Sequence, residues 1–275
     1  MSALAPTLRR VNLVLGGLFF GVIASGAALA LLWTPYDPLA INLLHRFAPP
    51  GPGHLLGTDQ FGRDVLSRAL GGAASSLSIA AMTVVFAIFF GSLIGTVSGY
   101  LRGTVDRIVM TFNDALLAFP GILLALGLMA VIGPNRYGIV LALGIAYTPS
   151  VVRVVRGTVL SIREREYVEA SRVLGNGEAY TMLRHVLPNA IAPIAVLATS
   201  MFGWVILSES ALSFLGLGVP PPAPTWGNML SGARPFLESA PWLAIAPGLC
   251  IAATMLGVNL LGDALRDRLD PRMAL

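Results

Sequence analysis

The chain has 275 residues, of which 55% are hydrophobic and only 12% are charged, against about 25% charged in an average soluble domain, so its composition predicts a polytopic membrane protein. All 18 basic residues are arginine, and the lack of lysine excludes a Walker A loop, whose lysine contacts nucleotide phosphates. One cysteine, Cys250, excludes an intrachain disulfide and a cysteine-based zinc site, and three scattered histidines predict no metal centre.

The first span is predicted in residues 11–36, which carry no charge and exceed the ~20 apolar residues that a bilayer requires. A secretory signal has an apolar core of only about 7–15 residues, and further spans follow here, so we expect this span to be retained.

Residues 37–70 combine prolines, glycines and mixed charges, which indicates a folded loop outside the membrane. Thr58 or Asp59 is expected to cap a short helix in this loop. The buried side of that helix is predicted to contain Val65, Leu66, Ala69 and Leu70. Asp59 and Asp64 are interpreted as cap and ion-pair residues rather than as an acid–base pair.

The second span is predicted in the uncharged run 69–101, where Gly91, Ser92 and Gly95 permit close packing of helices. A brief polar turn is expected to follow it, formed by Arg102, Asp106 and Arg107.

The third span is predicted at residues 115–135, with a kink at Phe119-Pro120-Gly121. Asp114 stands at its entrance, where we expect it to pair with an arginine at the membrane interface rather than to act in transport. The fourth span, residues 137–152, is extended by Arg153 and Arg156, whose long side chains can reach the membrane surface.

The longest polar segment runs from Arg153 to Pro188 and divides into two amphipathic helical pieces around Gly175-Asn176-Gly177. One face of the first piece is predicted to hold Tyr167, Ala170, Ser171 and Leu174. In the second piece Asn176 is the expected cap, and Pro188 is expected to begin a new helix. This pattern predicts a helix-turn-helix lying against a membrane.

The fifth span is predicted at residues 186–208 and is closed by Glu209. Four prolines in residues 210–233 rule out a continuous helix there, which indicates a re-entrant or surface loop with Trp226 as an interfacial anchor. The sixth span is predicted at residues 239–262.

Six spans place both termini on one side of the membrane. If that side is the cytoplasm, 13 arginines lie in inner segments and 5 in outer ones, as the positive-inside rule requires. This topology predicts cytoplasmic termini, a cytoplasmic polar segment and outer proline-rich loops. It also accounts for the net charge of +4 without nucleic-acid binding.

The polar segment resembles the EAA loop of ABC-importer permeases, with Glu169-Ala170-Ser171, three residues, Gly175, nine residues and then His185-Val186-Leu187-Pro188. Ser171 stands where that loop has a second alanine, and His185 stands where it has isoleucine. The resemblance implies a cytoplasmic coupling helix that docks on a separate ATPase. Its implied coupling residues are Glu169, Ala170, Ser171, Gly175, Leu187 and Pro188.

Three further stretches resemble permeases of the dipeptide/oligopeptide/nickel ABC importer family, and more narrowly its second, C-type subunit. They are Gly57-Thr58-Asp59 with Gly62-Arg63-Asp64, the run from Ala211 to Gly218 with Trp226-Gly227-Asn228, and the tail Asp263 to Pro271. The resemblance implies an all-α polytopic protein with the type I ABC importer permease fold. We divide it into an N-terminal region (1–72), a permease domain (73–263) and a cytoplasmic tail (264–275).

The resemblance also implies a function in the cell (inner) membrane, namely ATP-driven uptake of di- or oligopeptides. The implied partners are a second permease, two ATPases that bind ATP and magnesium, an extracytoplasmic solute-binding protein and membrane lipid. This chain would hold no cofactor, metal or catalytic residue of its own.

Three alternatives remain open at this point. A nickel or metal-chelate importer belongs to the same family. A passive channel or secondary transporter is a different class, but mid-span charges and inverted repeats, which such proteins often show, are not found. An intramembrane enzyme would need a motif such as His-Glu-x-x-His or Gly-x-Ser-x-Gly, and neither occurs in the sequence.

Overall fold

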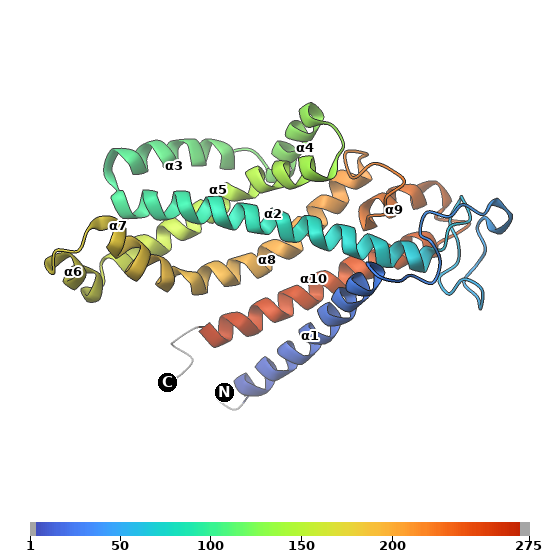
Figure 1. Cartoon of the computed structure of the whole chain (residues 1–275), viewed down its shortest axis with the longest axis horizontal. Helices are drawn as coiled ribbons and strands as arrows, with labels where there is room; N and C mark the ends of the chain where they lie inside the picture. Colours follow the sequence, from blue (N-terminus) through green and yellow to red (C-terminus); the bar gives the residue numbers. More distant parts are fainter. Residues whose placement is uncertain (1–3, 270–275) are drawn as a thin grey trace.

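The computed structural model describes residues 4–269, and within that range every regular element is a helix. The long helices lie side by side in an elongated bundle (Figure 1). In chain order the α-helices are α1 (Leu4–Ala30), α2 (Val65–Leu101), α3 (Gly103–Leu117), α4 (Gly121–Ile132), α5 (Arg136–Arg163), α6 (Glu166–Val173), α7 (Glu178–Thr181), α8 (Leu187–Phe214), α9 (Trp226–Ala233) and α10 (Trp242–Leu269). Two 3-10 turns (Leu43–His45 and Arg234–Phe236) and a π-helical turn (Met182–Val186) complete the described elements.

Five helical stretches of the described residues are long and apolar enough to cross a membrane, and a sixth is obtained if α3 and α4 count as one broken span. The expected kink at Phe119-Pro120-Gly121 is an 86° bend between two separate helices. Pro120 lacks the N–H that would continue α3, and α4 restarts at Gly121. The third span as predicted is therefore wrong in two respects, because it is broken and because its first helix begins at Gly103.

The expected polar turn between the second and third spans is also shorter than predicted. Arg102 alone separates α2 from α3, with a φ of 59°, and Asp106 already lies in α3. Asp106 accepts hydrogen bonds from Arg156 of α5, and Asp114 pairs with Arg153 at 2.7 Å. The prediction that Asp114 pairs with an arginine is thereby confirmed.

Helices α2 and α5 form the closest pair in the bundle, side by side in Figure 1. Gly91, Gly95 and Gly99 recur on one face of α2, where an added Cβ would lie within 2.9 Å of an atom of α5. At Gly95 and Gly99 that atom is a backbone carbonyl oxygen of α5, which cannot easily move aside. The small residues thus let the two backbones approach closely, as the sequence predicts.

We call residues 31–64 together with 215–241 the loop cap, which lies at one end of the bundle (Figure 1). The expected helix capped by Thr58 or Asp59 is not found. Asp64 caps α2 instead and accepts the Ser67 N–H at 2.8 Å, because the chain turns back at Gly62 before the helix starts. Asp59 is the ion-pair residue, 2.7 Å from the Arg63 Nε and 3.6 Å from the Arg68 Nε. The predicted inner side is confirmed at Val65 and Ala69, which are buried.

Glu209 does not close the fifth span. It lies inside α8, is fully buried, and accepts hydrogen bonds from Ser76 of α2 at 3.3 Å and Ser213 at 2.8 Å. Ser76 in turn accepts the backbone N–H of Trp226, and the Trp226 indole donates to the Ala69 carbonyl at 3.1 Å. Trp226 is therefore a buried anchor of the loop cap and not the interfacial residue predicted from its sequence context.

Candidate functional site

The candidate site is the segment of residues 164–186, which we call the elbow. It lies at the end of the bundle opposite the loop cap, where α6 and α7 protrude (Figure 1). The start of α1 and the end of α10 both point toward the elbow end. Glu166 and Glu169 occupy the first turn of α6, where carboxylates favour the positive end of the helix dipole.

The turn after α6 is built around Gly175, whose φ of 82° is accessible to glycine at little cost. The Gly175 N–H donates to the Arg172 carbonyl and the Asn176 N–H to the Ser171 carbonyl, which satisfies the end of the helix. The predicted sharp turn is confirmed. The predicted cap is wrong, because Gly177 precedes α7 and the Asn176 amide donates to the Ser171 hydroxyl instead.

The second helical piece is continuous with the fifth span. From Glu178 to Phe214 the chain forms one 37-residue helical stretch, interrupted by the π-helical turn at 182–186. Pro188 lies in the first turn of α8, as predicted, and this helix follows the π-helical turn without a gap. Pro188 has no N–H for the Arg184 carbonyl and would crowd it, and the wider π spacing just before it relieves that crowding. Continuous helical backbone thus joins α7 to α8.

The six predicted coupling residues divide into three groups. Glu169, Ala170 and Gly175 are exposed on the elbow, whereas Ser171 is buried and lies 3.0 Å from the Thr181 hydroxyl of α7. Leu187 and Pro188 belong to the base of α8. The predicted apolar face of α6 does not pack inward at three of its four positions, since Tyr167, Ala170 and Leu174 are exposed, whereas Val168 outside that face is buried. Only Ser171 of that face packs inward.

The exposed surface of the elbow is apolar at its tip. Val173 and Leu174 are 81% and 80% exposed, and Tyr180 and Leu183 are also exposed. Several large apolar side chains exposed within one short protruding segment are typical of a protein interface. Val173 was not among the residues expected from the sequence, although an apolar pair directly before the Gly175 turn was a readable signal.

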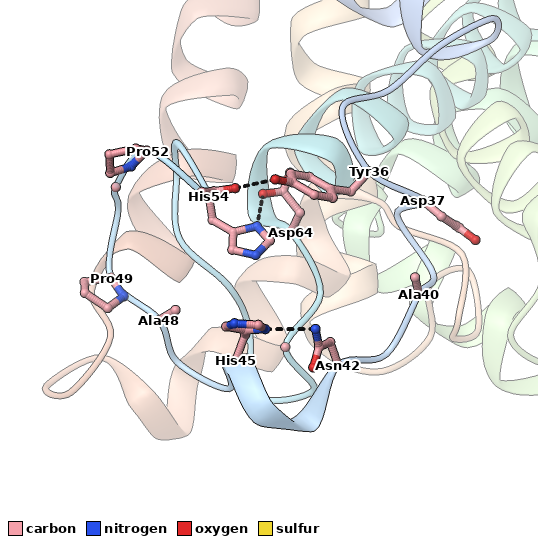
Figure 2. Close-up of a pocket in the computed structure, with 13 residues that line it drawn as sticks. Tyr36, Asp37, Ala40, Asn42, His45, Ala48, Pro49, Pro52, His54 and Asp64 are labelled. Atoms are coloured by element: carbon pink, nitrogen blue, oxygen red, sulfur yellow. Dashed lines mark hydrogen bonds and ion pairs between the residues drawn. The ribbon is translucent and has the colours of Figure 1, made fainter.

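The loop cap contains a cavity of about 560 Å³, whose lining includes Tyr36, Asn42, His45, His54 and Asp64. Figure 2 shows that its polar groups bond to one another: His54 Nδ1 lies 2.9 Å from Asp64, and the Tyr36 hydroxyl donates to the Gly53 carbonyl. The Asn42 side-chain oxygen accepts the Leu44 N–H, so its amide nitrogen donates to His45 Nδ1 at 2.8 Å. These contacts hold the loop together.

The sequence and structure match a known family. Residues 87–275 match the family described as "Binding-protein-dependent transport system inner membrane component". A putative peptide transport system permease protein of Brucella suis is 41% identical over 266 residues, covering 97% of this chain and 90% of the relative. The chain belongs to this family of transport permeases.

Two other relatives are similar over nearly their whole length. The Di/tripeptide transport system permease protein DppC of Pseudomonas aeruginosa is 42% identical, with 94% of this chain and 88% of the relative covered. The Glutathione transport system permease protein GsiD of Pectobacterium atrosepticum is 39% identical, with 97% and 89% covered. Membership of the family confirms that the permease is a multi-pass membrane protein and a subunit of an ABC importer.

Solved structures confirm the fold. The MetNI methionine ABC transporter, in inward-facing conformations, aligns with a TM-score of 0.61 at 17% identity, covering 74% of the permease and 96% of that chain. An amino acid ABC transporter with histidines gives 0.53 at 20% identity, with 74% and 94% covered. The all-α type I ABC importer permease fold expected from the sequence is therefore correct.

Proposed function

We propose that this permease imports di- or oligopeptides across the cytoplasmic membrane, with its elbow docked on an ATPase that powers transport. The observation that carries the proposal is the exposed apolar tip of the elbow, joined without a break to α8. Relatives named for peptides, di/tripeptides and glutathione support the peptide class.

The arginine distribution supports the orientation. The elbow, the start of α1 and the end of α10 lie toward the same end of the bundle, and 13 of the 18 arginines belong to the segments that a cytoplasmic elbow end would place inside. In the proposed orientation the elbow faces the cytoplasm, where ATP is available. The loop cap then faces the other side, where a solute-binding protein delivers cargo and a second permease completes the pathway.

In this mechanism the permease supplies no nucleotide chemistry, because ATP and magnesium are bound by the partner ATPases. Ala170 offers a small contact surface, Glu169 offers a charge, and Gly175 sets the turn that presents both. Ser171 ties α6 to α7 through Thr181. Leu187 and Pro188 fix how α8 leaves the elbow. Movement of the docked motor tilts α8, and rocking of the spans exposes the pathway to each side in turn.

Site-directed cross-linking tests the docking. In a Cys250→Ala background, Leu174→Cys should form a cross-link to the ATPase that co-purifies from native membranes. Leu44→Cys is the matched control, because it is 94% exposed but lies in the loop cap. A cross-link to the ATPase from Leu44→Cys, or none from Leu174→Cys, contradicts the proposal.

Coupling itself is tested at Gly175. A bulky residue is strained at a φ of 82°, so Gly175→Trp should distort the turn that presents the docking surface. ATP hydrolysis should continue, whereas peptide uptake should fall by about tenfold or more, the factor that corresponds to a backbone strain of this kind. Gly53→Trp is the control, since no atom lies within 4 Å of an added Cβ there. Normal coupled uptake by Gly175→Trp would contradict the coupling role of Gly175. Uptake of nickel instead of peptide by the reconstituted complex would favour the metal-importer alternative.

A further inference from the structure

Three helices meet at one aromatic ring where the bundle joins the elbow. Tyr100 is the penultimate residue of α2, and only 2% of its surface is exposed. The guanidinium of Arg163, the last residue of α5, lies 5.6 Å from the ring centroid, and that of Arg172 in α6 lies 5.1 Å from it. We call Tyr100, Arg163 and Arg172 the Tyr100 clamp.

Arg163 is attached to Tyr100 in a second way. Its Nη1 donates a hydrogen bond to the Tyr100 carbonyl oxygen, which is left free near the end of α2. Side chain and backbone of Tyr100 are therefore both held by α5. Since Gly91, Gly95 and Gly99 already lock α2 against α5, the end of this helix pair moves as one body.

Arg172 depends on the ring more than on ion pairing. Its Nε and Nη2 atoms are buried and have no hydrogen-bond partner, and the Glu178 carboxylate is 3.8 Å from the Nε. The Arg172 side chain is 29% exposed, so its two buried nitrogens are the part of the guanidinium for which the aromatic ring counts most, because cation–π attraction grows when water is removed. The face of Tyr100 is therefore the partner that holds α6 against the bundle.

The hydroxyl of Tyr100 lies near Glu178 and Arg172 but makes no hydrogen bond to either, so it contributes less to this arrangement than the ring does. The Tyr100 Oη is buried and makes no hydrogen bond, so the tyrosine acts here through its ring. Two substitutions of Tyr100 can therefore distinguish the contribution of the ring from that of the hydroxyl. Phenylalanine keeps the ring and removes only an unpartnered hydroxyl, whereas leucine keeps apolar volume and removes the aromatic face.

Building on the proposed function, we propose that Tyr100 is a positioning residue for energy coupling. Through Arg172 it receives the displacement of the docked elbow, and through Arg163 it delivers that displacement to the α2–α5 pair. The elbow would then drive the bundle along two routes, one through α7 into α8 and the other through the clamp into α2 and α5. Loss of the clamp should weaken the transfer of motion without preventing docking.

The test uses the whole importer, purified from native membranes and reconstituted in proteoliposomes with a radiolabelled pool of di- and tripeptides. The measured quantity is ATP hydrolysed per peptide imported. Tyr100→Leu should raise this ratio about tenfold, on the order of one desolvated cation–π contact. Tyr100→Phe should stay within about twofold of the wild type, and Arg172→Gln should behave like Tyr100→Leu.

The outcomes separate the clamp from the docking site. If Tyr100→Leu gives the wild-type ratio, or if Tyr100→Phe is as impaired as Tyr100→Leu, the clamp proposal is wrong. If Tyr100→Leu and Arg172→Gln both fail to assemble, the clamp is only structural and the proposal is again wrong. Failure of the Leu174→Cys cross-link in an otherwise wild-type complex would instead overturn the docking proposal on which this one rests.

Discussion

The two ends of the permease differ in how the segments that connect the long helices are stabilised. The loop cap satisfies its polar groups internally, with Asp64 capping α2, Asp59 between two arginines and Trp226 buried against Ala69. The elbow leaves Val173 and Leu174 exposed and, apart from Arg172, keeps its charged residues exposed. The loop cap is folded by its own contacts, whereas the elbow has a surface suited to a partner.

The difference predicts where mutations act. Changes in the loop cap should reduce the stability of the permease by itself. Changes at the tip of the elbow should leave its stability intact and reduce assembly or coupling. Substitutions at four positions test this contrast, in decreasing order of their expected effect on stability.

The largest effect is expected at Gly62. It has a φ of 73°, and an added Cβ would lie 1.7 Å from the Asn42 carbonyl oxygen, so Gly62→Val combines backbone strain with a clash against backbone. The free energy of unfolding should fall by more than about 3 kcal/mol, enough to remove the monodisperse peak in detergent size exclusion. Gly53→Val, with open space around it, should elute like the wild type.

The next effect is expected at Asp59. Its carboxylate lies between Arg63 and Arg68, both almost fully buried, and it also accepts the Phe61 and Arg63 N–H groups. Asp59→Ala leaves two buried guanidiniums without a counter-ion and should cost about 3–5 kcal/mol, measured as a lower thermal unfolding temperature. The exposed Glu238→Ala serves as the control. An equal shift in both variants would contradict the view of a tightly paired loop cap.

A smaller loss is expected at Glu209, which joins α8 to α2 and, through Ser76, to the loop cap. Glu209→Ala removes the acceptor of two buried hydroxyls and should cost about 2–3 kcal/mol. Glu209→Gln keeps an acceptor and a similar shape, so it should cost about 1 kcal/mol. If the two variants unfold at the same temperature, the hydrogen bonds do not explain why this carboxyl is buried.

The smallest effect on stability is expected at Leu174. Leu174→Ser changes a side chain that is 80% exposed, so the free energy of unfolding should stay within about 0.5 kcal/mol of the wild type. Affinity for the ATPase should nevertheless fall by about tenfold or more, since a buried leucine contributes about 1.5–3 kcal/mol. Retention of the ATPase during purification measures this. Loss of permease stability with unchanged ATPase retention would reverse the contrast between the two ends.

The sequence predicted the spans well because a charge-free run longer than a bilayer is thick is rarely found outside a membrane. It failed for polar side chains whose partners come from distant parts of the chain. Glu209 looked like the end of a helix, and only the fold brings it to Ser76, which is 133 residues away in the chain. Trp226 was misjudged for the same reason, since its partner Ala69 comes from a different helix.

In the elbow, the sequence located the turn, because Gly175 and Gly177 separate two segments with helical spacing. The structure places this turn at Gly175, which has a positive φ. The sequence did not give the rotation of α6, which is set by packing and puts Val168 inside instead of Tyr167. The continuity of α7 with α8 was also missed, because a proline usually indicates a helix start and here follows a π-helical turn. The role of Tyr100 depends on two arginines from other helices and left no pattern in the sequence.

The length of α2 has a mechanical consequence. Its 37 residues span about 55 Å, whereas the hydrocarbon layer is about 30 Å thick, so a rigid rod projects well past the lipid. A rotation of about 10° around its loop-cap end would sweep the far tip sideways by about 10 Å. A small hinge movement at one surface of the membrane is thereby magnified into a wide stroke at the other.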